Sequence, residues 1–172
     1  MFEKLPPTEI LNQIPKRNAP LKNLRKLPEL DPAYLNFLAM HEGLEITPDL
    51  KLSSYEAALT ENRVLALQSP KIAGTLWLIG RTGQGDEWFI DKNNGHILFF
   101  DHEQGEYANL SQFKDLGISF MEFLQMGFLY QELEILMDEN DDQLNKAYIE
   151  AFQAAINSIH PELADLYPFS YF

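Results

Sequence analysis

The chain has 172 residues, of which 45% are apolar and 12% aromatic, enough to bury a sizeable core over a single domain spanning residues 1–172. It contains no cysteine, which excludes disulfides, thiolate metal sites and cysteine nucleophiles. No stretch reaches the roughly 18 apolar residues that a membrane-spanning helix needs, and the first residues lack the basic and apolar pattern of a secretory signal. We therefore expect a soluble, cytoplasmic protein.

The net charge of −13 is distributed unevenly along the chain. Residues 1–30 hold six Lys or Arg against three Asp or Glu, so residues 31–172 carry a charge of −16. An acidic body repels nucleic-acid backbones and anionic membranes and attracts basic proteins. We therefore expect a protein partner, with no direct contact to nucleic acid or membrane. Solubility alone also explains an acidic composition, and the sequence leaves that explanation open.

Three regions follow one another in the sequence. Residues 1–26 are predicted to hold a short helix at 8–14 and a basic connecting arm. Pro15 ends that helix because its ring cannot continue the backbone hydrogen bonding. A core region is predicted at 27–137, and a C-terminal helix with an aromatic tail at 138–172.

Two helices are predicted near the beginning of the core region. Asp31 followed by Pro32 is typical of a helix start, because Asp accepts bonds from free N–H groups and Pro has a helical φ. Ser53 with Glu56 fits a capping box, which predicts a second helix through about Asn62.

The centre of the chain predicts β structure. Apolar runs at 75–80, 86–91 and 96–101 are separated by turns containing Gly, so we expect an antiparallel meander. Shorter strands are expected at 50–52 and 64–67. The run at 75–80 has apolar side chains in both alternating positions, which predicts a central strand covered on both faces.

The last part of the chain predicts helices again. Ser119 with Glu122 fits a capping box that opens a helix over 119–137. A final helix is expected at 143–159, and the aromatic tail at 167–172 should dock on the body. Helices on either side of a meander predict an α+β domain with a twisted, mainly antiparallel sheet flanked by helices.

Four pieces of the core region stand in a fixed order: Trp77-Leu78-Ile79-Gly80, Gly85-Asp86-Glu87-Trp88-Phe89-Ile90-Asp91, Phe100-Asp101-His102-Glu103 and Ser119-Phe120-x-x-Phe123-Leu124. Their order and spacing resemble the SUKH superfamily, whose name refers partly to the fungal Smi-one/Knr-four cell-wall regulators. Upstream, the pairs that look like the opening helix of the family are Leu27-Pro28, Tyr34-Leu35, Phe37-Leu38 and Glu42-Gly43. With them the resemblance covers roughly residues 27–125. It implies helices around a mainly antiparallel sheet.

The resemblance also implies a function. Most bacterial members look like immunity proteins that bind and neutralise a cognate toxin, often a nuclease or deaminase, and eukaryotic relatives look like regulatory modules that bind host proteins. The family has no shared catalytic triad, so the resemblance implies neither an enzyme nor a cofactor. The motif residues, whose roles are structural or binding, are Trp77, Gly80, Gly85, Asp86, Trp88, Asp91, Gly95, His102 and Glu103.

Acidic and imidazole side chains gather at the predicted strand ends, namely Asp86, Asp91, Asp101, His102 and Glu103. Such groups could bind a metal ion or serve as an acid and base, which leaves a metal-dependent hydrolase as a remote alternative. Asp is also typical of hairpin corners, where it accepts backbone N–H bonds. We expect this capping role and no bound metal.

Two further groups of residues have alternative interpretations. Trp77 and Trp88 could form a binding platform, but tryptophans in strands more often belong to the core. The predicted acidic loop at 138–142 is a first candidate for a partner contact, and the alternative is a solvated linker. The candidate contacts are Asp138, Glu139, Asp141 and Asp142.

Overall fold

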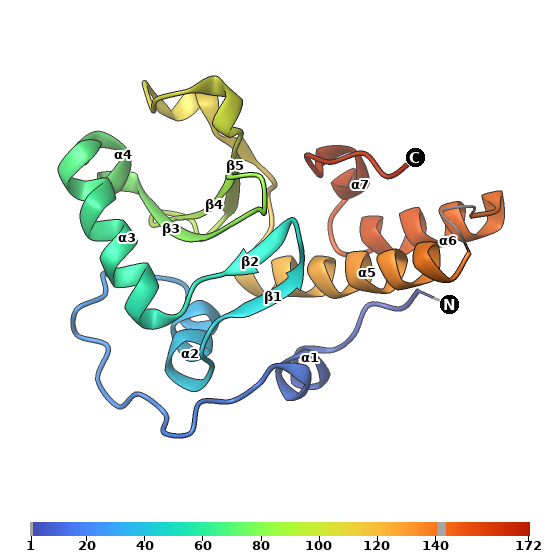
Figure 1. Ribbon diagram of the computed structural model, residues 1–172, viewed down its shortest axis with the longest axis horizontal. Coiled ribbons are helices and arrows are strands. Elements are labelled where there is room, and N and C mark those ends of the chain that lie inside the picture. The colour runs from blue at the N-terminus through green and yellow to red at the C-terminus, as the bar shows by residue number, and fades with distance from the viewer. Residues whose placement is uncertain (1, 141–143) are drawn as a thin grey trace.

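The computed structural model describes residues 2–140 and 144–172, and these residues form seven α-helices and a six-stranded antiparallel sheet (Figure 1). The predicted α+β class is confirmed. The helices are α1 (Pro7–Gln13), α2 (Pro32–Met40), α3 (Tyr55–Gln68), α4 (Pro70–Thr75), α5 (Phe120–Glu139), α6 (Lys146–Asn157) and α7 (Leu163–Leu166). The strands are β1 (Leu44–Thr47), β2 (Leu50–Leu52), β3 (Leu76–Arg81), β4 (Glu87–Asp91), β5 (Ile97–Phe100) and β6 (Lys114–Asp115).

Each strand pairs with the strand before it, so the sheet order is β1-β2-β3-β4-β5-β6 and the predicted meander is confirmed. The predicted strand at 64–67 is wrong, because these residues belong to α3. Ala58, Asn62 and Leu65 are the buried side chains of α3, and their spacing is that of one helix face. The strands β1 and β6 and the helix α4 were not predicted.

Both faces of the central strands are buried. Trp77 and Ile79 of β3 point into the larger apolar cluster, which includes α5. Leu76 and Leu78 point into a smaller cluster under the end of α3 and α4. The predicted double covering of this strand is therefore confirmed, since alternate residues of one strand enter two separate cores.

The two helices near the beginning of the core region start close to their predicted positions. The side chain of Asp31 accepts hydrogen bonds from the backbone N–H groups of Ala33 and Tyr34, at 2.8 and 3.1 Å. In α3 the cap is Ser54 and not Ser53, because Ser54 Oγ accepts the bond from Ala57 N. Ser53 Oγ instead donates to Glu61, one position outside the helix start.

The long helix α5 lies against the sheet and begins with the predicted capping box of Ser119. Phe120, Phe123 and Leu124 are fully buried, as predicted. The ring of Phe123 lies 5.0 Å from that of Trp88 on β4. At Gly127 a Cβ atom would come within 2.9 Å of Ile46 Cδ1, so the absence of a side chain allows α5 to approach β1 closely.

The aromatic tail docks on the body, as predicted. Tyr167 is 5% exposed, and its ring stacks on that of Tyr130 with centroids 3.8 Å apart. Phe169 packs edge-on against Phe99 of β5 at 5.5 Å. The preceding helix α6 is shorter than the predicted helix at 143–159, whose first residue lies outside the described part of the chain.

The two edges of the sheet are irregular. The ladder between β1 and β2 shifts register between Glu45 and Thr47, and the carbonyl of the intervening Ile46 accepts a bond of 2.8 Å from Gln131 Nε2 of α5. At the other edge, β6 has only two residues. Within the described residues, no helix combines the length and the apolar character needed to cross a bilayer.

Replacing Phe123 with Ala should lower the free energy of unfolding by about 3–5 kcal/mol, because it removes a buried ring from the contact between α5 and the sheet. Chemical denaturation of both proteins measures the difference. Leu67→Ala is the control, since Leu67 is 80% exposed and its loss should change the stability by less than about 0.5 kcal/mol. A loss below about 1 kcal/mol for Phe123→Ala would contradict its place in the core.

Candidate functional site

The strongest polar constellation lies at one end of the β4–β5 hairpin. Asp86 precedes β4, while Asp101 and His102 follow β5, and one ligand atom from each lies within 4.8 Å of the others. Glu103 lines the same small recess, whose volume is about 160 Å³. The structure therefore brings together four of the five side chains predicted to cluster. We call this the hairpin recess.

Asp86 is the central residue of the hairpin recess. Its side chain is buried, with the residue 4% exposed, and it accepts bonds from Thr82 Oγ1 at 3.0 Å and from the backbone N–H of His102 at 3.1 Å. His102 Nδ1 lies 2.5 Å from Asp86 Oδ1, where its N–H donates to the carboxylate. The carboxylate thus joins the turn before β4 to the segment after β5.

The two partners shift each other's ionisation. Burial raises the pKa of Asp86, but the hydrogen bonds from His102 and Thr82 outweigh it and hold this pKa below its usual value. The hydrogen bond to Asp86 raises the pKa of His102, with further contributions from the charges of Asp101 and Glu103. Both shifts favour the charged forms, so the pair is an ion pair at the surface.

The fifth side chain predicted for this constellation, Asp91, lies elsewhere. It stands at the far end of β4, about 17 Å along the strand from Asp86 at ~3.3 Å per residue. Its carboxylate accepts a bond of 2.7 Å from the N–H of Asn93, and that of Asp101 accepts one of 2.8 Å from Glu103. The predicted capping role is therefore confirmed for Asp91 and Asp101.

Trp77 and Trp88 belong to the core. They are 7% and 0% exposed, and both lie in the apolar cluster that contains α5. The indole N–H of Trp88 donates to the backbone carbonyl of Asp49 at 2.8 Å, and that of Trp77 donates to Tyr34 Oη at 3.2 Å. Their packing favours the structural interpretation over a binding platform.

The motif glycines have backbone roles. At Gly80 a Cβ atom would lie 2.2 Å from the carbonyl oxygen of Lys51, so only Gly permits β2 and β3 to approach at this point. Gly85 has a φ of +104° in the turn before β4, which a residue with a side chain rarely adopts. Gly95, in the following turn, also has a positive φ.

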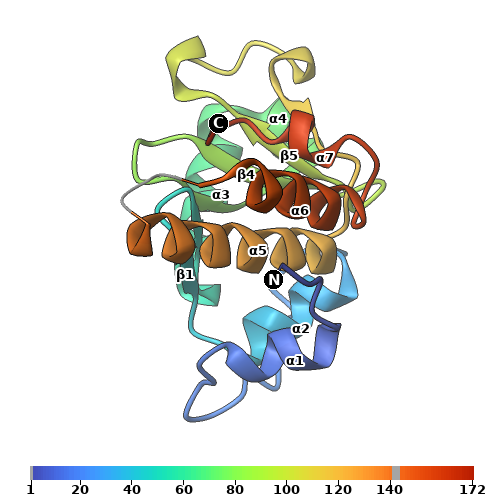
Figure 2. The same cartoon turned by 90° about the vertical axis from the view of Figure 1, so that its right-hand side faces the viewer.

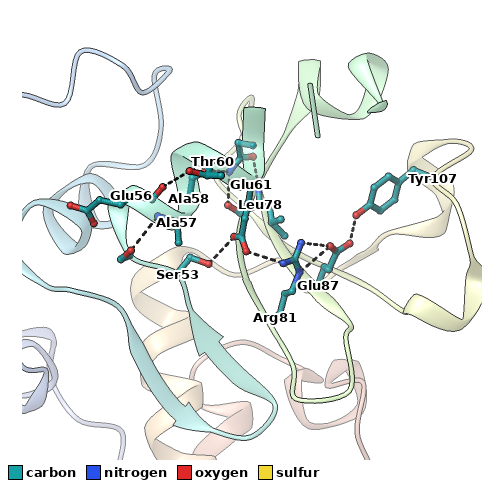
Figure 3. A network of polar contacts seen from close by, with 12 residues as sticks. Ser53, Glu56, Ala57, Ala58, Thr60, Glu61, Leu78, Arg81, Glu87 and Tyr107 are labelled. Carbon is teal, nitrogen blue, oxygen red and sulfur yellow. Dashed lines mark hydrogen bonds and ion pairs between the residues drawn. The ribbon is translucent and has the colours of Figure 1, made fainter. Parts of the chain in front are cut away.

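A second polar network was not predicted from the sequence. Arg81, at the end of β3, donates to Glu61 of α3 at 2.8 Å and to Glu87 of β4 at 3.1 Å (Figure 3). Glu61 also accepts from Ser53, and Glu87 accepts from Tyr107 in the loop after β5. Arg81 and Glu87 face each other across the hairpin. In the sequence they have opposite charges and stand at equal distances from the predicted turn, a pattern that could have predicted this ion pair.

The predicted acidic loop at 138–142 is partly helical. Asp138 and Glu139 belong to the last turn of α5, so the prediction of a loop is wrong for these two residues. Asp141 and Asp142 lie outside the described residues. A partner contact at these four positions stays a prediction.

Comparison with known proteins gives no relative for this chain, because no family model, no curated protein and no solved structure matches it. The resemblance to SUKH proteins therefore depends only on the order and spacing of the motifs in the sequence.

The ion pair in the hairpin recess should be visible in a pH titration. Because the pKa of His102 is raised, its contribution to stability is complete below the ordinary value of 6.5 and is lost as the pH rises through the shifted pKa. The contribution of Asp86 to stability is complete above the ordinary pKa of an Asp carboxyl group. It is lost as the pH falls through the lowered pKa. We expect the titration of His102, followed by NMR, to have its midpoint above 6.5 and to move down in Asp86→Asn. His160, in the turn before α7, is the internal reference, and equal midpoints in the two proteins would contradict the ion pair.

We also expect the purified protein to contain no stoichiometric metal. A metal ion on Asp86 would have to compete with the hydrogen bonds that its two oxygens accept from His102 and Thr82. Elemental analysis checks this expectation. About one zinc, manganese or calcium ion per chain, lost in Asp86→Ala or His102→Ala, would instead support the metal site.

Proposed function

We propose that this protein is a non-enzymatic binding module of the immunity type, which neutralises a basic toxin domain such as a nuclease or deaminase. The observation that carries the proposal is the charge of −16 on residues 31–172. An enzyme that handles nucleic acid needs a basic surface for its polyanionic substrate. An acidic protein can occupy such a surface in place of the substrate.

The hairpin recess supports this proposal through its chemistry. Asp86 accepts three hydrogen bonds that join two turns, which is a structural role. Asp101 and Glu103 stand beside it, and Glu103 is exposed to solvent. The SUKH-like motif in the sequence supports the same function, since the family resemblance implies protein binding and no catalytic residue.

The test begins with the gene next to this one. If that gene encodes a large protein ending in a toxin-like domain, co-expression with this protein should restore the growth of cells that the toxin domain otherwise stops. The two purified proteins should then form a complex. A neighbouring toxin that neither binds this protein nor is neutralised by it would contradict the proposal and favour the alternative, a regulatory module for host proteins.

The electrostatic part of the proposal predicts a specific dependence on salt. Exposed charges are screened beyond roughly 8 Å at physiological ionic strength. Raising the salt concentration should therefore slow the association of toxin and protein much more than it speeds their dissociation. Stopped-flow or surface-binding kinetics across a salt series measure both rates, and an association rate that does not change with salt would exclude electrostatic steering.

A further inference from the structure

Figure 2 shows α5 between the start of the chain and α6. A groove lined by residues of these three segments follows the outward face of α5. It consists of two adjoining cavities of about 230 and 340 Å³, which share the side chain of Glu132. From Gln125 at one end to Glu139 at the other, it follows the helix for about 21 Å, at ~1.5 Å per residue. We call it the α5 groove.

Apolar side chains line both cavities of the α5 groove, beside the polar side chains of Gln125 and Glu132. Phe128 and Leu129 line the first cavity, and Ile135 and Leu136 line the second. Ile135 is 55% exposed, although it lies on a helix whose opposite face is fully buried. Phe128 and Leu136 are partly exposed beside it, and a contiguous apolar patch with a polar rim is typical of an interaction site.

The walls of the groove are fixed by contacts within the chain. Gln125 Nε2 of α5 donates to the carbonyl of Leu5 at 2.8 Å, which holds the start of the chain beside the helix. The ring of Phe2 packs edge-on against Phe152 of α6 at 5.2 Å. Tyr148 of α6 lines the opposite side. These contacts within the chain hold both walls in place, as in the largely pre-formed sites where ligands usually bind.

The rim of the groove carries one sign of charge. Glu3, Glu132 and Glu139 are exposed along it, and none of the described residues lining either cavity is Lys or Arg. The nearby Lys146 of α6 bonds to Glu150 on its own helix at 3.3 Å. Apolar side chains with carboxylates above them match the shape of lysine and arginine, whose stems lie on apolar surfaces while their charged ends reach outward.

We propose that the α5 groove receives an amphipathic helical segment of the partner protein, with bulky apolar side chains on one face and lysine or arginine beside them. The inference rests on the proposed function, in which the partner is basic, and it assigns the contact surface to α5. Apolar anchors fill the two cavities, and the basic side chains pair with Glu132 and Glu139. This is the way in which amphipathic helices bind to grooves in other proteins.

Two sets of variants with matched controls test the groove. Glu132→Gln with Glu139→Gln removes two charges from the rim, and Glu29→Gln with Glu106→Gln removes two exposed charges elsewhere. Ile135→Ser removes the apolar anchor site, and Leu67→Ser removes an exposed apolar side chain from α3, far from the groove. The four Glu residues replaced in the rim variant and in its control are all exposed to solvent. Each variant should therefore fold, and circular dichroism checks this.

The first probe is a fluorescent peptide of about 14 residues, with Leu at helical spacing and Lys at the other positions. We expect the rim variant to weaken its binding roughly 2- to 30-fold, as two partly exposed charge pairs contribute ~0.2–1 kcal/mol each. Ile135→Ser should weaken it about 5-fold. The matched controls should bind the peptide as the unaltered protein does. Equal affinities for groove and control variants would overturn the inference.

The second probe is the toxin domain from the neighbouring gene, measured with the same variants. A toxin that binds all variants with equal affinity would overturn the groove and leave the proposed function intact. If the toxin does not bind at all, the proposed function fails, and the peptide alone decides whether the groove takes a basic segment. Sedimentation of the unaltered protein tests a second copy as the occupant, since a dimer that Ile135→Ser dissociates would overturn the proposal of a different partner.

Discussion

The contact between α5 and one face of the sheet is the constraint on which the other elements depend. Phe123 packs against Trp88 at the centre of the meander, and Gly127 brings the same helix against β1. Once α5 occupies this face, the remaining apolar surface of the helix must be covered by the start of the chain, α6 and the aromatic tail. The opposite face of β3 to β5 is then left to α3, α4 and the loop before β6, which supply a second, smaller core. Two separate cores on one sheet follow from central strands with consecutive apolar residues, as at 76–79 of β3 and Ile97–Phe100 of β5.

Features fixed by neighbours in the sequence could be predicted, and features fixed by distant contacts could not. The caps at Asp31 and Ser119 and the turns with Gly85 and Gly95 depend on a few consecutive residues, and they are found where the sequence placed them. The run at 64–67 is apolar enough for a strand, but the burial of Leu65 against the sheet requires a helix. The strand β6 has two polar residues and no pattern of its own. The α5 groove could not be predicted, because one wall comes from residues 2–5, more than a hundred positions before the helix.

The sequence also could not predict which residues of the candidate site lie together. In a meander, consecutive turns lie at opposite ends of the sheet, because each strand reverses the direction of the chain. Asp86 before β4 and His102 after β5 therefore share one end, while Asp91 after β4 belongs to the other. Strand order alone separates them, although all three are strand-end residues in the sequence. Strand order also brings Arg81 and Glu87 together, since they face each other across a single turn. Arg81 donates a further hydrogen bond to Glu61 of α3.

The irregular edges of the sheet have a consequence for the behaviour of the protein in a crowded solution. An open sheet ends in two strands whose free N–H and C=O groups can template the addition of a strand from another molecule, which leads to aggregation. Here the shift of register at Ile46 breaks the regular spacing that a neighbouring strand would need, and Gln131 already occupies the carbonyl of that residue. The opposite edge, β6, offers two residues, too few to hold an added strand in register. A chain whose strands are apolar on both faces thus presents no long, regular edge through which those strands could recruit copies of themselves within its described residues.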